Sequence, residues 1–83
     1  MRTRQELLER IAADPNICFG KPVIRGTRIW VSLILDLMSS GLSEGEVLVE
    51  YPQLKTEDVR AALAYGAATA HVRHIPVTAS HSP

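Results

Sequence analysis

The sequence has few cysteines, no net charge and no long apolar run, and each of these absences excludes a class of protein. It has a single cysteine, Cys18, so no disulfide can form within the chain, as is typical of a reducing cytoplasm. Its formal net charge is zero, so no overall field attracts it to nucleic acid. No apolar run approaches the length of a membrane span, and the N-terminus lacks a signal-peptide core. We therefore expect a cytoplasmic protein that does not associate with membranes.

Aromatic residues are also scarce, so the hydrophobic core must be aliphatic. The chain of 83 residues is 46% hydrophobic, but it contains only four aromatic side chains: Phe19, Trp30, Tyr51 and Tyr65. This length predicts one small domain over residues 1–73, followed by a flexible tail without periodicity over residues 74–83. A core of this size often gains stability through oligomerisation.

The charges are unevenly distributed although they sum to zero. Residues 1–42 hold six basic and four acidic side chains, whereas residues 43–83 hold three basic and five acidic ones. Three of the basic side chains fall within the segment 20–29, which reads Gly-Lys-Pro-Val-Ile-Arg-Gly-Thr-Arg-Ile. Proline, β-branched residues and a glycine that permits a turn predict two short extended pieces joined at residues 25–27. We expect an ordered basic β element here.

The sequence after this segment is helical in pattern. Apolar residues recur at helical spacing over 31–40, and Gly41 is placed to end that helix in a left-handed conformation. A second apolar row, formed by Trp30, Leu33 and Leu37, widens the apolar surface beyond what a small domain can cover, so we expect part of it to meet another chain. Residues 5–13 are compatible with either a helix or a strand.

Two further helices are predicted from their caps. Ser43 and Glu46 form a capping box at the start of a short helix, which Pro52 should end. Thr56 is expected to cap a third helix, whose inner face should consist of Val59, Ala62, Leu63, Gly66, Ala67 and Ala70. We therefore predict a mainly α fold with a short N-terminal β element followed by a three-helix bundle, in which the last two helices have the spacing of a helix-turn-helix.

The basic segment contains candidate contacts for phosphate. Gly20 and Lys21 do not form a P-loop, because Pro15 and Pro22 occupy positions where that motif needs Gly and Ser or Thr. Arg25 and Arg28 have two possible roles that do not exclude each other. They can pair with acids such as Asp14 or Asp36 and hold the turn, or they can contact phosphate.

The remaining candidates favour no catalytic chemistry. Glu57 and Asp58 at the start of the third predicted helix would face phosphates of like sign, which argues against that helix reading bases. Three histidines, His71, His74 and His81, have no cysteine or carboxylate beside them, so we expect no metal site. Cys18 lies between apolar residues and is expected to be a small buried side chain. We predict that the protein is not an enzyme and needs no cofactor.

Several motifs together resemble one bacterial family. They are Asp-Pro-Asn-Ile-Cys at 14–18, Gly-Lys-Pro-Val-Ile-Arg-Gly-Thr-Arg-Ile at 20–29, Gly-Leu-Ser at 41–43, Tyr-Pro-Gln-Leu at 51–54 and Asp-Val-Arg-Ala-Ala-Leu-Ala-Tyr at 58–65. Over about residues 8 to 70 the chain closely resembles the family catalogued as domain of unknown function 433. One departure is Trp30, where the family usually has proline. The resemblance implies a homeodomain-like fold with a short β element.

The resemblance also implies a function, because members of this family often look like antitoxins of Vap-type systems. It implies a homodimeric antitoxin that binds a PIN-like ribonuclease toxin and represses its own operon by binding operator DNA. The candidate DNA-binding residues are Lys21, Arg25, Thr27 and Arg28, and the candidate dimer or partner interface is Trp30, Leu33 and Leu37. The alternative is a small adaptor that binds proteins and not DNA, which the acidic start of the third predicted helix favours.

Overall fold

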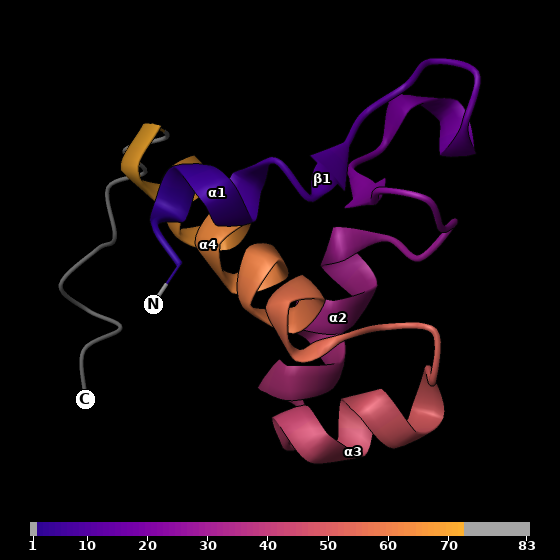
Figure 1. The fold of residues 1–83 in the computed structure, drawn as a ribbon, viewed down its shortest axis with the longest axis vertical. Coiled ribbons are helices and arrows are strands. Elements are labelled where there is room, and N and C mark those ends of the chain that lie inside the picture. Colours follow the sequence, from indigo (N-terminus) through magenta and orange to yellow (C-terminus); the bar gives the residue numbers. More distant parts are fainter. Residues whose placement is uncertain (1, 73–83) are drawn as a thin grey trace, which may run out of the picture.

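The computed structural model describes residues 2–72, so the predicted tail, with His74 and His81, lies outside the described residues. Over this range the chain forms four helices, a two-stranded antiparallel sheet and one 3-10 turn (Figure 1). They are α1 (Arg4–Leu8), β1 (Ile11–Ala12), η1 (Cys18–Gly20), β2 (Val23–Ile24), α2 (Val31–Ser39), α3 (Glu44–Glu50) and α4 (Thr56–Val72). The expected mainly α fold with a short N-terminal β element is confirmed, and α1 adds a helix to the predicted three. None of the helices in the described range is long and apolar enough to span a membrane.

The ambiguous stretch 5–13 contains both a helix and a strand. Thr3 caps α1, because its hydroxyl accepts from the Glu6 N–H at 3.1 Å while the Glu6 carboxylate accepts from the Thr3 N–H at 2.9 Å. This capping box was missed at the sequence level, although its spacing is visible there. β1 then pairs with β2, with Ile11 opposite Ile24.

Local signals set the boundaries of α2 and α3 as predicted. Gly41 has φ +115°, and the N–H groups of Gly41 and Leu42 donate to the carbonyls of Met38 and Leu37, which closes α2 in a Schellman motif. Ser43 and Glu46 form the predicted capping box. Trp30 precedes α2 with φ −69°, a value that proline also adopts, so the backbone at this position is compatible with either residue.

The start of α4 differs from the prediction. Thr56 is the first helical residue rather than the cap, and the Lys55 carbonyl accepts from the Val59 N–H at 3.3 Å. The Asp58 carboxylate takes the capping role by accepting from the Lys55 N–H at 2.9 Å. A carboxylate of the first turn is thereby fixed toward the protein and not toward solvent.

The core lies where α4 meets the other elements. In Figure 1, α4 crosses the molecule, with α1 beside its C-terminal half and α2 beside its N-terminal half. The predicted inner face of α4 was wrong in part, because Leu63 (43% exposed) and Ala70 are exposed while Ala61 is fully buried. The packing of α1 and the sheet against α4 rotates the buried face toward Ala61. The core comprises Val23, Ile24, Ile29, Val31, Ile34, Val47, Leu54, Val59, Ala61 and Ala62.

Candidate functional site

The basic segment forms a tight turn after β2. The Thr27 N–H donates to the Ile24 carbonyl at 2.9 Å, and Gly26 has φ +82°, as the third residue of a type II turn requires. The Thr27 hydroxyl donates to the Ile24 carbonyl at 2.7 Å and accepts from the Ile29 N–H at 3.0 Å. Val23 also forms a β-bridge with Trp30. The two predicted extended pieces therefore exist, and Thr27 holds the turn between them.

Arg25 is anchored to the backbone and not to an acid. Its Nε donates to the Glu9 carbonyl at 2.9 Å and its Nη2 donates to the Ile11 carbonyl at 3.0 Å. Of the two roles left open for Arg25, pairing with an acid such as Asp14 or Asp36 does not occur, because the turn aims its guanidinium at the connection between α1 and β1. Two N–H groups of the Arg25 guanidinium thus hold the connection between α1 and β1 in place. Its other N–H groups have no hydrogen-bond partner among the residues that the structure describes.

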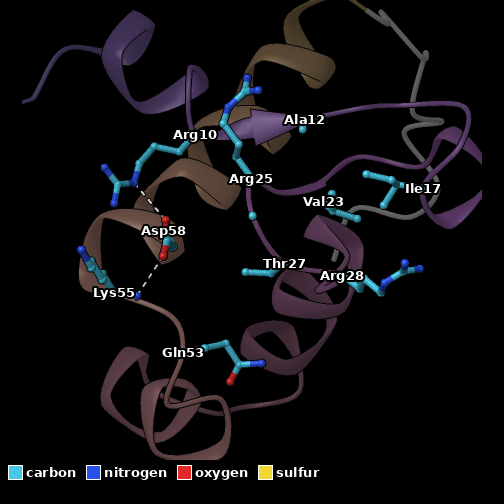
Figure 2. Close-up of a pocket in the computed structure, with 11 residues that line it drawn as sticks. Arg10, Ala12, Ile17, Val23, Arg25, Thr27, Arg28, Gln53, Lys55 and Asp58 are labelled. Carbon is cyan, nitrogen blue, oxygen red and sulfur yellow. Dashed lines mark hydrogen bonds and ion pairs between the residues drawn. The ribbon is translucent and has the colours of Figure 1, made fainter.

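This turn forms one wall of an open groove of about 810 Å³ (Figure 2). The opposite wall is the connection between α3 and α4, so the groove lies at the N-terminal end of the second helix of the predicted helix-turn-helix pair. Four basic side chains and one acidic side chain line it, together with six other residues. The lining residues are Arg10, Ala12, Ile17, Val23, Arg25, Gly26, Thr27, Arg28, Gln53, Lys55 and Asp58.

The one carboxylate of the groove is withdrawn from solvent. Asp58 is 7% exposed and its Oδ1 accepts from the Arg10 Nε at 2.9 Å, while Oδ2 accepts from the Lys55 N–H. Figure 2 shows both interactions on one side of the groove, with Arg28 on the other side. Asp58 therefore does not present the repulsive charge to a ligand that the sequence alone suggests. Glu57, its neighbour, lines a separate hollow with Arg2 and Arg60.

The predicted DNA-binding residues are only partly brought together. Arg25, Thr27 and Arg28 line the groove, whereas Lys21 lies outside its lining and places its Nζ 4.9 Å from the centre of the Trp30 ring. Arg10 and Lys55 complete the basic groove, although neither is among those four candidates. Lys55 stands beside the predicted start of the third helix, where a basic residue favours DNA, whereas no local signal could have identified Arg10, which reaches its carboxylate partner across 48 positions of the sequence.

The predicted partner interface is half covered within the chain. Leu33 and Leu37 pack partly against the core, while Trp30 remains 37% exposed beside Lys21. Cys18 is half-buried instead of fully buried, and its Sγ lies 3.9 Å from the Arg28 carbonyl. Among residues 2–72 no group of three His, Cys, Asp or Glu side chains could hold a metal ion.

Comparison with known proteins identifies the family of this chain. The family described as "Protein of unknown function (DUF433)" matches residues 11–66, which include both strands and most of α4. The chain belongs to the DUF433 family. A crystal structure of a DUF433 member from Anabaena variabilis superposes with a TM-score of 0.72 and 34% sequence identity, covering 82% of this chain and 67% of that chain.

A curated relative is considerably longer than this DUF433 chain. The protein y4eO of Sinorhizobium fredii, whose name describes it as uncharacterized, is 35% identical over 75 residues. The match covers 82% of this chain and 34% of the relative, so the chain spans about a third of that protein's length. These matches show the DUF433 family and, through the crystal structure, its fold, but they show neither an activity nor a partner.

Proposed function

We propose that this DUF433 protein binds nucleic acid through the basic groove and acts as an antitoxin that represses its own operon. The observation that carries the DNA half is the placement of Arg10, Arg25, Arg28 and Lys55 around one groove whose only carboxylate is already paired. Neither Arg28 nor Lys55 has an ion-pair partner within the described part of the chain. Phosphates binding there would release counterions without breaking an existing ion pair.

The position of the groove supports the same conclusion. It lies at the start of α4, whose aligned peptide dipoles place partial positive charge at that end. The two carboxylates at the start of α4 argue less strongly against phosphate binding than the sequence suggests. Asp58 is paired with Arg10, so only Glu57 remains accessible. Arg25 contributes its charge from a fixed position, since two backbone carbonyls hold its fork.

The antitoxin half rests on the family resemblance. It requires a homodimer and a PIN-like ribonuclease partner, and the row of Trp30, Leu33 and Leu37 is the candidate interface for one of them. The exposed portion of Trp30 supports this role, because about a third of a large apolar side chain is left uncovered.

The DNA half is tested by fluorescence anisotropy with the promoter fragment of the protein's own operon. We expect Arg28→Ala and Lys55→Ala each to weaken binding and to reduce the salt slope by about one. Arg60→Ala is the matched control, because Arg60 is an exposed basic residue in α4, five positions after Lys55, but lies outside the groove. Equal effects of all three variants, or no promoter binding by the wild type, would refute the groove as a DNA site.

The antitoxin half is tested separately by co-expression with the product of the adjacent gene. We expect a nuclease-like neighbour to co-purify with this protein and to lose ribonuclease activity in the complex. Sedimentation of the free protein should show a dimer, and Trp30→Glu should dissociate it. Absence of a nuclease-like neighbour, or of a complex with it, refutes the antitoxin assignment and leaves the DNA result unaffected.

A second candidate function is a protein-binding adaptor, which the surface of α3 favours. This helix carries Glu44, Glu46 and Glu50 with no basic residue, and Val49 is 81% exposed between them. An acidic surface of this kind at the first helix of a helix-turn-helix pair would repel a DNA backbone. Salt-independent binding of a partner protein, combined with no promoter binding, would identify this function.

A further inference from the structure

Phe19 is the most exposed large apolar side chain in the described range, with 94% of its surface accessible. It lies in η1, within the loop between β1 and β2 that projects away from the helices in Figure 1. Its backbone is left-handed, with φ +58°, and its neighbours Cys18 and Gly20 have φ +51° and +80°. Only glycine adopts this conformation without steric cost, so both Cys18 and Phe19 are strained.

The loop is ordered in spite of this strain. The Asp14 carboxylate accepts from the Asn16 N–H at 2.8 Å, and the Asp14 carbonyl accepts from the Ile17 N–H at 2.9 Å. The Gly20 N–H donates to the Ile17 carbonyl at 3.0 Å. These bonds hold Phe19 in a fixed position, yet the chain itself buries almost none of its ring. The strained backbone and the exposed ring of Phe19 both destabilise the free protein, and burying the ring against a ligand would offset this destabilisation.

Phe19 belongs to the loop between β1 and β2, and one residue of that loop, Ile17, lines the basic groove. Ile17, two residues before Phe19, lines the groove together with Arg28, and Figure 2 shows these two on the same side. Cys18 ties the loop to the Arg28 carbonyl. Trp30, the other exposed aromatic of the described range, also belongs to this region and lies against Lys21. Tyr51 and Tyr65, by contrast, pack against the core.

We propose that Phe19 stacks on a nucleobase at the edge of the groove, while Arg28 and Lys21 contact the neighbouring phosphates. This proposal rests on nucleic-acid binding by the groove and names the element that holds a base. The base face can come from an unpaired strand or from an opened step in a duplex. Nucleic acid is favoured over a protein pocket because every nucleotide supplies a flat apolar face beside an anion. A protein would need carboxylates around its pocket to balance the charges of Lys21 and Arg28.

The test compares Phe19→Ala, Phe19→Leu and wild type by anisotropy on a labelled 20-nucleotide single strand and on the promoter duplex. We expect Phe19→Ala to weaken binding about 5- to 150-fold, with Phe19→Leu intermediate. The salt slope should stay unchanged, since no charge is lost, whereas Arg28→Ala should lower it. A 2-aminopurine base placed along the strand should change its fluorescence with wild type and not with Phe19→Ala. The larger loss, on the strand or on the duplex, identifies the source of the base.

Three results would overturn the stacking role. If wild type binds with a salt slope but Phe19→Ala binds equally well on both substrates, Phe19 is not a stacking residue and the groove proposal survives. If wild type binds neither substrate, both proposals fail together. A change of sedimentation in Phe19→Ala without a change in nucleic-acid affinity assigns the side chain to a protein contact and overturns the stacking role. Phe19 is exposed, so these variants should fold, and circular dichroism verifies this.

Discussion

The ion pair between Arg10 and Asp58 supports both the stability of the fold and the charge of the groove. It joins the segment between α1 and β1 to the first turn of α4. Replacing Arg10 by Met keeps the aliphatic stem but leaves the buried carboxylate with the Lys55 N–H as its remaining partner. We expect this single change to destabilise the protein and to weaken nucleic-acid binding at the same time.

The magnitude follows from burial and geometry. A hydrogen bond to a charged group contributes about 1.5–3 kcal/mol, and removal of one partner from a fully buried pair costs about 3–5 kcal/mol. The Arg10 side chain is 29% exposed and that of Asp58 is 10% exposed, so we expect the lower range, about 2 kcal/mol. For a domain of this size each kcal/mol lowers the Tm by about 4–8 °C, which gives a fall of about 8–16 °C.

The assay is a double-mutant cycle with Arg10→Met, Asp58→Asn and the double variant, measured by urea and thermal unfolding. The two changes should be coupled by about 1–2 kcal/mol, because each removes the same interaction. The coupling should survive in 1 M salt, where surface pairs are screened over about 3 Å. A coupling near zero, or one that disappears in salt, would show that Arg10 does not hold Asp58 in place, and the reasoning about the groove would be wrong.

Three further predictions concern the turn, the cap and the strained loop. Arg25→Lys should destabilise the protein by about 1 kcal/mol, since lysine cannot reproduce the fork, while Arg28→Lys should leave the Tm unchanged in the same melts. The backbone and side-chain hydrogen bonds from Ser43 lower the pKa of Glu46, so its contribution to stability is present above pH 4.5 and lost as the pH falls through the lowered pKa. Glu46→Gln should therefore reduce the acid sensitivity of stability, and parallel acid curves would contradict this. Phe19→Gly should raise stability by up to about 1 kcal/mol in urea titrations, because it relieves left-handed strain and sacrifices no burial; a loss of stability would refute the strain.

Much of the helical part could be predicted from the sequence because its signals are local. A capping box needs only residues three positions apart, and a Schellman motif needs a glycine just after the last turn. The mainly α fold and the turn at Gly26 follow from signals of this kind. Residues 5–13 remained ambiguous because an apolar pattern over only nine residues cannot separate a short helix from a short strand.

The site depended on contacts between distant parts of the chain. Arg25 was recognised as important from its segment, but only the fold determines that its fork binds the carbonyls of Glu9 and Ile11. The exposure of Leu63 in place of Ala61 likewise follows from the packing of α1 and the sheet on α4. Helical periodicity predicts how wide the apolar face of a helix is. The elements that pack against the helix determine which part of that face is buried.

The sequence by itself determined the helices, their caps and the basic turn of this protein, because those features arise from interactions within a few residues. The tertiary structure decided the charge of the groove. Asp58 reads as an obstacle to phosphate in the sequence, but Arg10, 48 positions away, neutralises it and turns it inward. The strand pairing of β1 with β2 brings Arg10 and Arg25 to the same groove, and no local pattern encodes that meeting.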